Sequence, residues 1–473
     1  MVRGAQPERP NILFALADDW SWPHAGIYGD RFARTPVFDR VAREGVVFNR
    51  AYCNSPSCTP SRGAMLTGQA SHRLEEGGNL WSILLKKFPV YPDILESAGY
   101  FVGYEIKGWG PGSLLGSGRT RNPAGPVFRD FEQFLRDKPA AKPFCYWFGS
   151  RDPHRQYVPG SGIAGELKPE DVVVPPFLPD TPEVRRDLLD YYFAVQRFDR
   201  RVGDLLQLLE ASGQFDRTLV VITSDNGMPF PRAKANLYDY GTHMPLAMRW
   251  PGRFRPGTVI DDFVSFCDFA PTFLEAVGLK PPPEMTGRSM LLLIDGRERG
   301  NRDMVFTERE RHSNVRKGDL SYPSRAVRTR EFLYIRNLKP DRWPVGDPEK
   351  WKAGGAFGDI ENSPAKKVLV EGLEDPRYAR LFRLGFDKRP EEELYDLAKD
   401  PDEFNNVAGR PECAEPQRRL RAALGKWMKE TRDPRAFGGG DEFDRYPSFQ
   451  GGGLGAGDSP NAPPRTETES TPR

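Results

Sequence analysis

The chain has 473 residues, which is enough for two domains with sizeable cores or for one large domain with an appendage. Its formal net charge is only +2 although 28% of its residues are charged, so no overall field indicates nucleic acid or an acidic membrane as a partner. The five cysteines are too few and too scattered for a disulfide scaffold or a CxxC metal site; they are Cys53, Cys58, Cys145, Cys267 and Cys413.

The N-terminal part of the chain alternates between predicted strands and helices. Residues 11–17 form a continuous apolar run, which is typical of a strand buried on both faces. Residues 181–213 begin with a Thr-Pro cap, carry apolar residues at helical spacing and end at glycine, so they predict one long amphipathic helix. The other predicted elements are helices at 35–45 and 91–98 and strands at 100–106, 144–148 and 218–223. This alternation predicts an α/β fold.

The pattern changes near residue 321. Residues 326–329 and 332–335 are two short runs separated by a charged turn, which predicts an antiparallel hairpin. Residues 416–429 predict a helix, with apolar residues on one side. Glycine, proline, serine and threonine dominate beyond residue 437, and too little apolar material remains there to order the chain. We therefore expect an α/β domain at 1–320, a smaller α+β domain at 321–437 and a disordered tail at 438–473.

Two acidic pairs come directly after predicted strands: Asp18-Asp19 after the first strand, and Asp225-Asn226 after the strand at 218–223. Ligands of open parallel sheets gather outside the carboxyl ends of the strands. Three carboxylates and an amide oxygen form a hard, all-oxygen set that suits Ca²⁺ or Mg²⁺ rather than Zn²⁺. Each pair alone also fits a simple turn, because Asp-Asp can solvate a turn and Asp-Asn-Gly is a common turn sequence.

Cys58 opens the run Cys-Thr-Pro-Ser-Arg, and Leu-Thr-Gly follows at 66–68. Pro60 sets φ for a first helical turn, so residue 58 is expected at a helix N-terminus, where backbone N–H groups favour an anion. Arg62 lies one turn further on and can offer its guanidinium to sulfate or carboxylate oxygens. A free thiol is only slightly ionised at neutral pH, so a catalytic role requires a lowered pKa or chemical conversion. The alternatives are a small buried residue or a local disulfide with Cys53.

The complete run from Cys58 to Gly68 resembles the signature of the type I sulfatase family, and the acidic pairs match that family in chain order. The resemblance implies a sulfuric-ester or sulfamate hydrolase whose substrate is a sulfated saccharide. It implies that a formylglycine-generating or sulfatase-maturating enzyme converts Cys58 to Cα-formylglycine. It also implies one calcium ion, with magnesium as the alternative, held by Asp18, Asp19, Asp225, Asn226 and residue 58.

The family's fold is alkaline phosphatase-like. The resemblance therefore implies a large mixed, mostly parallel sheet flanked by helices. It further implies a smaller C-terminal α+β domain that contains a four-stranded antiparallel sheet.

The same resemblance implies roles for further residues. Lys107 takes the place of a family lysine that contacts the sulfate, although isoleucine and tryptophan stand where most members have glycine before this lysine and histidine two residues after it. Lys234 is also placed to hold the sulfate, with Arg232 as the competing candidate. His154 resembles the family histidine that serves the leaving group. Predicted substrate contacts are His72, His243, His312 and Trp109, the last as a stacking wall for a sugar, whereas His24 is expected to be structural or exposed.

Several runs are similar to the N-sulfoglucosamine sulfohydrolase branch of this family, over nearly the whole chain before the tail. They are Ser-Asp-Asn-Gly-Met-Pro-Phe-Pro at 224–231, Asn-Leu-Tyr at 236–238, Val-Val-Pro-Pro-Phe at 173–177 and Ser-Tyr-Pro at 321–323. N-sulfated glucosamine of heparan-type glycans is therefore the leading substrate. The alternatives are an O-sulfatase of another polysaccharide, a phosphate or phosphonate monoester hydrolase, and a catalytically silent protein that binds sulfated glycans.

The sequence leaves the compartment open. The family suggests a periplasmic or secreted protein, but residues 1–10 lack the apolar core of a signal peptide, so a cytoplasmic location is expected if the sequence is complete. No run of about 18 apolar residues occurs, and no membrane span is expected.

Overall fold

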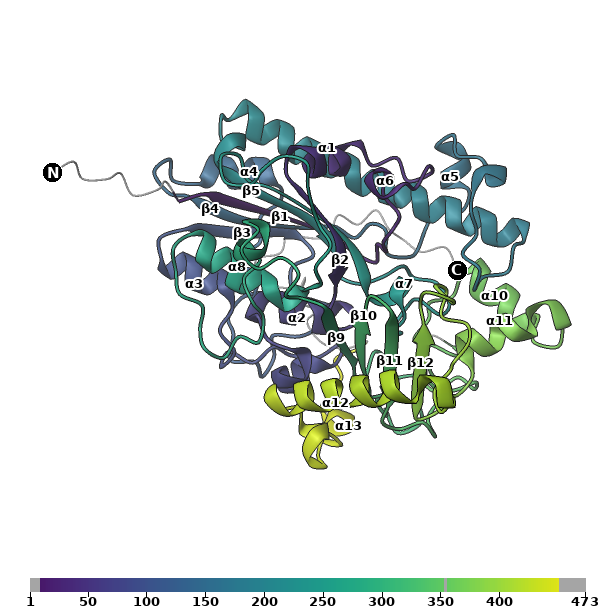
Figure 1. Cartoon of the computed structure of the whole chain (residues 1–473). Helices are drawn as coiled ribbons and strands as arrows, with labels where there is room; N and C mark the ends of the chain where they lie inside the picture. The colour runs from purple at the N-terminus through teal and green to yellow at the C-terminus, as the bar shows by residue number, and fades with distance from the viewer. Residues whose placement is uncertain (1–8, 353–354, 451–473) are drawn as a thin grey trace.

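The computed structural model describes residues 9–352 and 355–450, and its centre is an eight-stranded sheet (Figure 1). The strand order is β3-β4-β1-β5-β6-β2-β7, with β8 beside β2. Among the described strands, β6 runs antiparallel to both of its neighbours and the other pairs are parallel. The predicted α/β fold with a mixed, mostly parallel sheet is therefore confirmed. The strands are β1 (Asn11–Ala17), β2 (Val46–Tyr52), β3 (Phe101–Ile106), β4 (Phe144–Gly149), β5 (Thr218–Ser224), β6 (His243–Arg249), β7 (Thr258–Ile260) and β8 (Val264–Ser265).

Helices cover both faces of this sheet because alternate residues of its strands point to opposite sides. From β1, Phe14 packs against Phe269 and Phe273 of α8 (Phe269–Ala276), whereas Leu13 joins the cluster of the long helix α6 (Pro182–Ala211) on the other face. One face carries α2 (Cys58–Thr67), α3 (Tyr91–Ser97) and α8 (Phe269–Ala276), and the opposite face carries α1 (Pro36–Glu44), α4 (Phe131–Asp137) and α6 (Pro182–Ala211) (Figure 1).

The centre of the sheet positions the candidate site. All seven residues of β1 and all seven of β5 are buried, and the two strands pair in parallel, with Ala17 opposite Ser224. The next residues, Asp18 and Asp225, therefore emerge at the same edge of the sheet, and the Asp225 amide donates a hydrogen bond of 3.1 Å to the Ala17 carbonyl. The two acidic pairs meet because their strands are neighbours.

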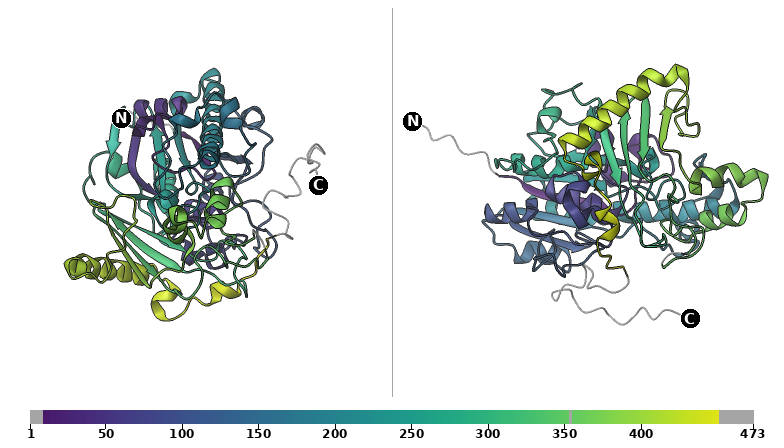
Figure 2. Two further views of the ribbon diagram at one scale, coloured as in Figure 1. Left: turned by 90° about the vertical axis from the view of Figure 1, so that its right-hand side faces the viewer. Right: turned by 90° about the horizontal axis from the view of Figure 1, so that it is seen from below.

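A second sheet is four-stranded and antiparallel, in the order β12-β11-β10-β9, as predicted. Helix α12 (Ala414–Glu430) lies across it (Figure 2), where Leu420 and Leu424 pack against Val327 and Tyr334. Strand β9 precedes residue 321, where we expected the smaller domain to begin, so this sheet recruits an earlier segment of the chain. The strands are β9 (Met304–Arg309), β10 (Ser324–Thr329), β11 (Phe332–Asn337) and β12 (Glu392–Asp396).

Residues 438–450 correct part of the predicted disordered tail, because they fold onto the protein and include the short helix α13 (Glu442–Arg445). Phe443 is buried, and its carbonyl accepts a hydrogen bond of 2.9 Å from the Asn79 amide group. Arg311 donates to the carbonyl of Tyr446 over 2.7 Å. One aromatic anchor and satisfied backbone carbonyls order this segment despite its composition. Residues 451–473 of the predicted tail lie outside the described residues.

The remaining helices are short. They are α5 (Ser161–Ala164), α7 (Asp239–Thr242), α9 (Leu291–Ile294), α10 (Pro364–Glu371) and α11 (Pro376–Phe386). Within the described ranges, no helix combines the length and the apolar character needed to cross a bilayer. The 3₁₀ turns are Gly26–Tyr28, Ser71–Gly78, Pro169–Asp171, Phe215–Arg217, Phe266–Asp268, Pro411–Cys413 and Pro434–Phe437.

Candidate active site

An acidic cluster forms where β1 and β5 end. Asp18, Asp19 and Asp225 are buried, and they offer oxygens that lie, together with Cys58 Sγ, within 4.8 Å of one another. Asp225 Oδ1 accepts a hydrogen bond of 3.1 Å from the Asp19 amide, and Asn226 Nδ2 donates to Asp19 Oδ1 over 2.6 Å. The structure therefore brings together the four predicted ligands and Cys58.

The other side of the Asn226 amide tests whether this cluster fits a cation. Asn226 Oδ1 is buried and accepts no hydrogen bond from the described part of the chain. A buried acceptor without a partner costs about 1–3 kcal/mol, so such atoms usually indicate a missing water or ion. An amide oxygen beside three carboxylates is the donor set that Ca²⁺ and Mg²⁺ prefer. The residues present therefore fit a hard divalent cation.

Cys58 is the first residue of α2, as predicted, and is 3% exposed. Its Sγ lies 3.5 Å from Asp18 Oδ1. Cys53 and Cys58 are both free, so the local disulfide is not formed. Burial raises the pKa of the Cys58 thiol well above its usual value, although Lys107 opposes this effect. An unmodified thiol in this place stays protonated and is a poor nucleophile.

Arg62 fixes the geometry beneath the cluster. Its guanidinium is fully buried, and Nε donates to Asp225 Oδ2 over 2.8 Å while Nη1 donates to the carbonyls of Lys107 and Gly108 over 2.9 Å each. Nη2 lies 3.5 Å from Asp18 Oδ1 and forms no hydrogen bond with the described residues. Arg62 therefore presents one unsatisfied donor toward the acidic cluster.

Lys107 and Lys234 neutralise the first acidic pair. Lys107 Nζ lies 2.7 and 2.6 Å from the two carboxylate oxygens of Asp18, and Lys234 Nζ lies at the same two distances from those of Asp19. Burial alone would raise the pKa of Asp18, but Lys107, His154 and Arg62 together lower it to about 2. Arg232, the alternative to Lys234, points elsewhere and donates to the carbonyl of Leu384 over 2.9 Å.

His154 lies at the exposed side of the cluster, with Nε2 3.8 Å from Asp19 Oδ2. Its Nδ1 contacts the backbone carbonyl of Arg155, which can only accept a hydrogen bond. Nδ1 therefore carries a hydrogen, and Nε2 is the nitrogen that can gain or release a proton. This is the orientation that a proton donor to a leaving group requires.

Glu361 is a site residue that the sequence analysis missed. Its Oε1 lies 3.6 Å from His154 Nε2 and 3.4 Å from Lys234 Nζ. Burial would raise the pKa of this carboxyl, but Lys234, His154 and His312 lower it to about 2, so it is ionised at neutral pH. No motif marks Glu361, because it lies in a loop far along the chain from the acidic pairs.

The family of the chain follows from comparison with known proteins. The family profile described as "Sulfatase" matches residues 10–113 and 122–279, and that described as "N-sulphoglucosamine sulphohydrolase, C-terminal" matches residues 232–373. The chain is 32% identical to human N-sulphoglucosamine sulphohydrolase over 92% of its own length and 93% of that protein. The chain belongs to the sulfatase family. It is therefore an enzyme of the hydrolase class.

Other relatives and structures are similar over most of this sulfatase. An ulvan-active sulfatase of Formosa agariphila is 28% identical over 90% of this chain and 76% of that protein. A protein solved with its substrate D-glucosamine-2-N,6-O-disulfate superposes with a TM-score of 0.64 and 20% identity, covering 90% of this chain and 99% of that one. The phosphonate monoester hydrolase of Agrobacterium radiobacter gives a TM-score of 0.66 at 17% identity, covering 89% and 96%. At such identities the structures show a common fold alone.

His312, one of the predicted substrate contacts, touches the residue that precedes Cys58. It shares a hydrogen bond of 2.8 Å with Ser57 Oγ, and Ser57 is the residue immediately before Cys58. Burial lowers the pKa of His312 to about 3, and Lys234 contributes to this, so the ring is neutral at physiological pH. A neutral, buried ring in this place supports the start of α2.

His72 and His243 are not in the pocket, contrary to the prediction. His72 is buried against the second sheet, where Nδ1 donates to Glu308 Oε2 over 2.6 Å. His243 is stacked between Trp22 and Tyr52, with ring centroids 4.4 and 4.5 Å away. Both histidines follow site motifs closely in sequence, but the chain turns away before reaching them, and their role is structural.

Trp109 also corrects a prediction, because it is 1% exposed and belongs to the core cluster around α2, α3 and α8. Its backbone amide donates to Asn122 Oδ1 over 2.9 Å. A ring buried in this way cannot stack on a sugar.

His24 was expected to be either structural or exposed. The structure shows that it is structural, since it is buried and its Nδ1 lies 3.0 Å from the buried Tyr191 hydroxyl.

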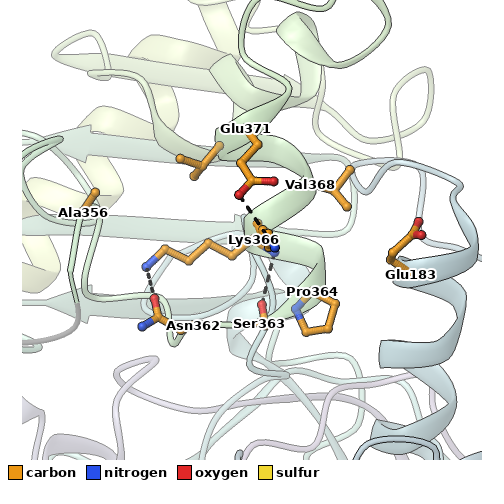
Figure 3. Close-up of a pocket in the computed structure, with 10 residues that line it drawn as sticks. Glu183, Ala356, Asn362, Ser363, Pro364, Lys366, Val368 and Glu371 are labelled. Carbon is orange, nitrogen blue, oxygen red and sulfur yellow. Dashed lines mark hydrogen bonds and ion pairs between the residues drawn. The ribbon is translucent and has the colours of Figure 1, made fainter.

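A cavity of about 850 Å³ lies between α10 and the start of α6 (Figure 3). Asn362, Ser363 and Lys366 line it, together with Glu183 of α6. None of the predicted site residues lines this cavity. Asn362 is nevertheless the residue after Glu361, so the wall of the cavity continues along the chain into the charged cluster.

Proposed function

We propose that this sulfatase removes the sulfate group from the nitrogen of N-sulfated glucosamine, as it occurs in heparan-type glycans. The observation that carries the proposal is the similarity to human N-sulphoglucosamine sulphohydrolase along nearly the whole of both chains. The match to the C-terminal profile of that enzyme supports the same substrate, because Lys234, His312 and Glu361 all lie within the matched residues.

One calcium ion and a formylglycine at position 58 complete the proposed site. Asp18, Asp19, Asp225 and Asn226 would hold the cation, which fits the unpartnered Asn226 Oδ1. When present, formylglycine supplies a hydrated aldehyde whose hydroxyl attacks sulfur, and calcium supplies positive charge for the sulfate oxygens. The protonated state of the buried Cys58 thiol supports this conversion, since the unmodified side chain is unsuited to attack.

The side chains around the cluster bind and neutralise the sulfate group. Arg62 holds the floor of the site in place and offers its unsatisfied Nη2, while Lys107 and Lys234 bring two ammonium groups to the acidic pair. These cations are fixed before substrate arrives, so little reorganisation accompanies the development of charge during reaction. His154 gives a proton from Nε2 to the departing nitrogen, which then leaves as an uncharged amine.

The decisive experiment examines residue 58 itself. We expect mass spectrometry of the peptide spanning residues 51–62 to show loss of the Cys58 sulfur and a carbonyl that reacts with hydrazine. We expect Cys58→Ala to abolish hydrolysis of N-sulfoglucosamine, because no group remains to attack sulfur. Cys413→Ala is the matched control and should keep activity, since Cys413 lies against α12, remote from the acidic cluster.

Three results would contradict the proposal. An intact cysteine at position 58 in active protein would exclude the formylglycine mechanism. Rapid turnover of O-sulfated sugars or phenyl phosphonate, with no turnover of N-sulfoglucosamine, would show that the substrate belongs to one of those classes instead. A calcium-loaded protein that binds the sugar without turnover favours the binding-protein alternative.

A further inference from the structure

The carboxylate of Glu361 stands beside the histidine that serves the leaving group. Oε1 faces His154 Nε2 and Lys234 Nζ at 3.6 and 3.4 Å. Oε2 is buried and accepts no hydrogen bond from any residue that the structure describes, although the side chain as a whole is 28% exposed. A carboxylate in a site built to bind an anion is unfavourable unless it has a specific partner, so Glu361 requires an explanation.

The surrounding loop fixes Glu361 firmly. Two residues earlier, the buried Asp359 receives Nη2 of Arg309 and Nη2 of Arg316, each at 2.6 Å. Ile360 packs in a separate hydrophobic cluster, and its carbonyl accepts a hydrogen bond of 2.8 Å from Lys366 Nζ. Asn362 follows at the wall of the cavity in Figure 3. The loop is therefore anchored immediately before Glu361 by ion pairs and packing, which favours a preorganised position of its carboxylate.

The chemistry of the leaving group distinguishes the two kinds of substrate. In a sulfamate the atom bonded to sulfur is a nitrogen that carries a hydrogen, whereas the bridging oxygen of a sulfate ester carries only lone pairs. A carboxylate accepts a hydrogen bond from the first and repels the second. When the S–N bond breaks, its electron pair stays on nitrogen, which takes a proton from His154 and leaves as an amine that can become cationic.

We propose that Glu361 is a specificity residue that accepts a hydrogen bond from the leaving nitrogen and so selects N-sulfated over O-sulfated sugars. This inference rests on the proposed function and identifies the side chain that distinguishes the N-sulfated substrate from O-sulfated sugars. Its position next to His154 places the acceptor where the leaving group must depart. A charged hydrogen bond of this kind is available to the nitrogen substrate alone.

The test compares Glu361→Gln with the unaltered protein on N-sulfoglucosamine and on 4-nitrophenyl sulfate, an O-sulfate without an N–H. We expect kcat/KM for N-sulfoglucosamine to fall about 10- to 100-fold, the loss expected for one charged hydrogen bond. The value for 4-nitrophenyl sulfate should fall by a much smaller factor. Glu374→Gln, on the exposed turn after α10, is the matched control and should leave the ratio of the two activities unaltered.

A second readout does not depend on turnover of the nitrogen substrate. Glucosamine should inhibit 4-nitrophenyl sulfate hydrolysis more strongly than glucose does, and Glu361→Gln should remove this difference. Glu361→Asp keeps the negative charge and should retain part of the difference between glucosamine and glucose. This second variant tests the inference even if Glu361→Gln does not fold.

Equal losses on both substrates would overturn the inference and make Glu361 a structural partner of Lys234, while the proposed function stands. An unaltered protein that cleaves O-sulfates alone would overturn the proposed substrate, and the inference with it.

Discussion

Asn226 is the residue whose surroundings bear most directly on the proposed cation. Its Nδ2 is bonded to Asp19 whereas its buried Oδ1 has no hydrogen-bond partner in the described ranges. A ligand that binds only the folded state stabilises it, by about 2.7 kcal/mol at 100 times its dissociation constant. The cation should therefore be visible in thermal unfolding as well as in activity.

We expect calcium to raise the melting temperature of the unaltered protein relative to a sample treated with a chelator. Asn226→Ala removes one oxygen ligand, so the increase should be lost or at least halved, as measured by differential scanning calorimetry. Asn301→Ala replaces an exposed asparagine and serves as the control. An unchanged calcium effect in Asn226→Ala would exclude Asn226 as a ligand.

The residues that could be anticipated from sequence are those whose neighbours along the chain carry the signal. Asp18 and Asp225 follow buried strands, so local patterns indicated that the two acidic pairs could meet at one edge of the sheet. The place of Cys58 beside them was implied by the resemblance to the sulfatase family. Glu361 had no such signal, because its relation to His154 arises only when the second part of the chain folds against the first. Proximity in sequence also misled, since His72 follows the Cys58 motif closely yet contacts β9.

At the scale of elements, Glu105 of β3 lowers the stability of the folded protein when its carboxyl ionises. This side chain is buried in a strand, and burial raises its pKa from the usual 4.5 to about 7, although Arg201 partly offsets the effect. In the unfolded chain Glu105 ionises near its usual pKa of 4.5, whereas in the folded protein it stays protonated until about pH 7. The contribution of Glu105 to folding stability is therefore greatest below pH 4.5 and is lost as the pH rises from 4.5 to about 7. Since one pH unit of separation is worth about 1.4 kcal/mol, the loss is about 3 kcal/mol.

We expect Glu105→Gln to be more stable than the unaltered protein at pH 8, by up to about 3 kcal/mol, because the amide cannot ionise. The advantage should disappear as pH falls toward 4.5. Urea unfolding at several pH values measures this, with the exposed Glu170→Gln as control. A stability difference that does not vary with pH would contradict the assignment of the shift to Glu105.

The helices and strands differ in how far the local sequence determines their structure. The sequence predicts β1, β5 and α6 to within one or two residues, because a continuous apolar run or a capped amphipathic helix is decisive by itself. The antiparallel placement of β6 between β5 and β2 had no local signal, since it depends on which strands pair. Strand β9 joined the second sheet for the same reason.

On the scale of the whole molecule, a small hydrophobic cluster links the second sheet to the loop that follows the acidic edge. Leu237 and Tyr238, which follow the acidic edge, pack with Ala326 and Leu333 of the second sheet. Arg328 of β10 forms two hydrogen bonds of 2.9 Å with Asp239. This cluster and the half-buried bidentate pair couple the stability of the two parts.

We therefore expect one cooperative unfolding transition rather than two. Urea curves followed by tryptophan fluorescence and by far-ultraviolet circular dichroism should have the same midpoint, because the contacts between the second sheet and the loop after the acidic edge are lost when either part unfolds. Separate midpoints for the two signals would show that the sheets unfold independently.

The complete enclosure of α2 has a consequence for how the protein matures. All ten residues of this helix are buried, with Cys58 at its base. If Cys58 is converted to formylglycine, as we propose, the docked helix leaves its side chain only 3% exposed to a modifying enzyme. We therefore expect the conversion to precede the docking of α2, and a copy that folds first to retain its cysteine and to be inactive.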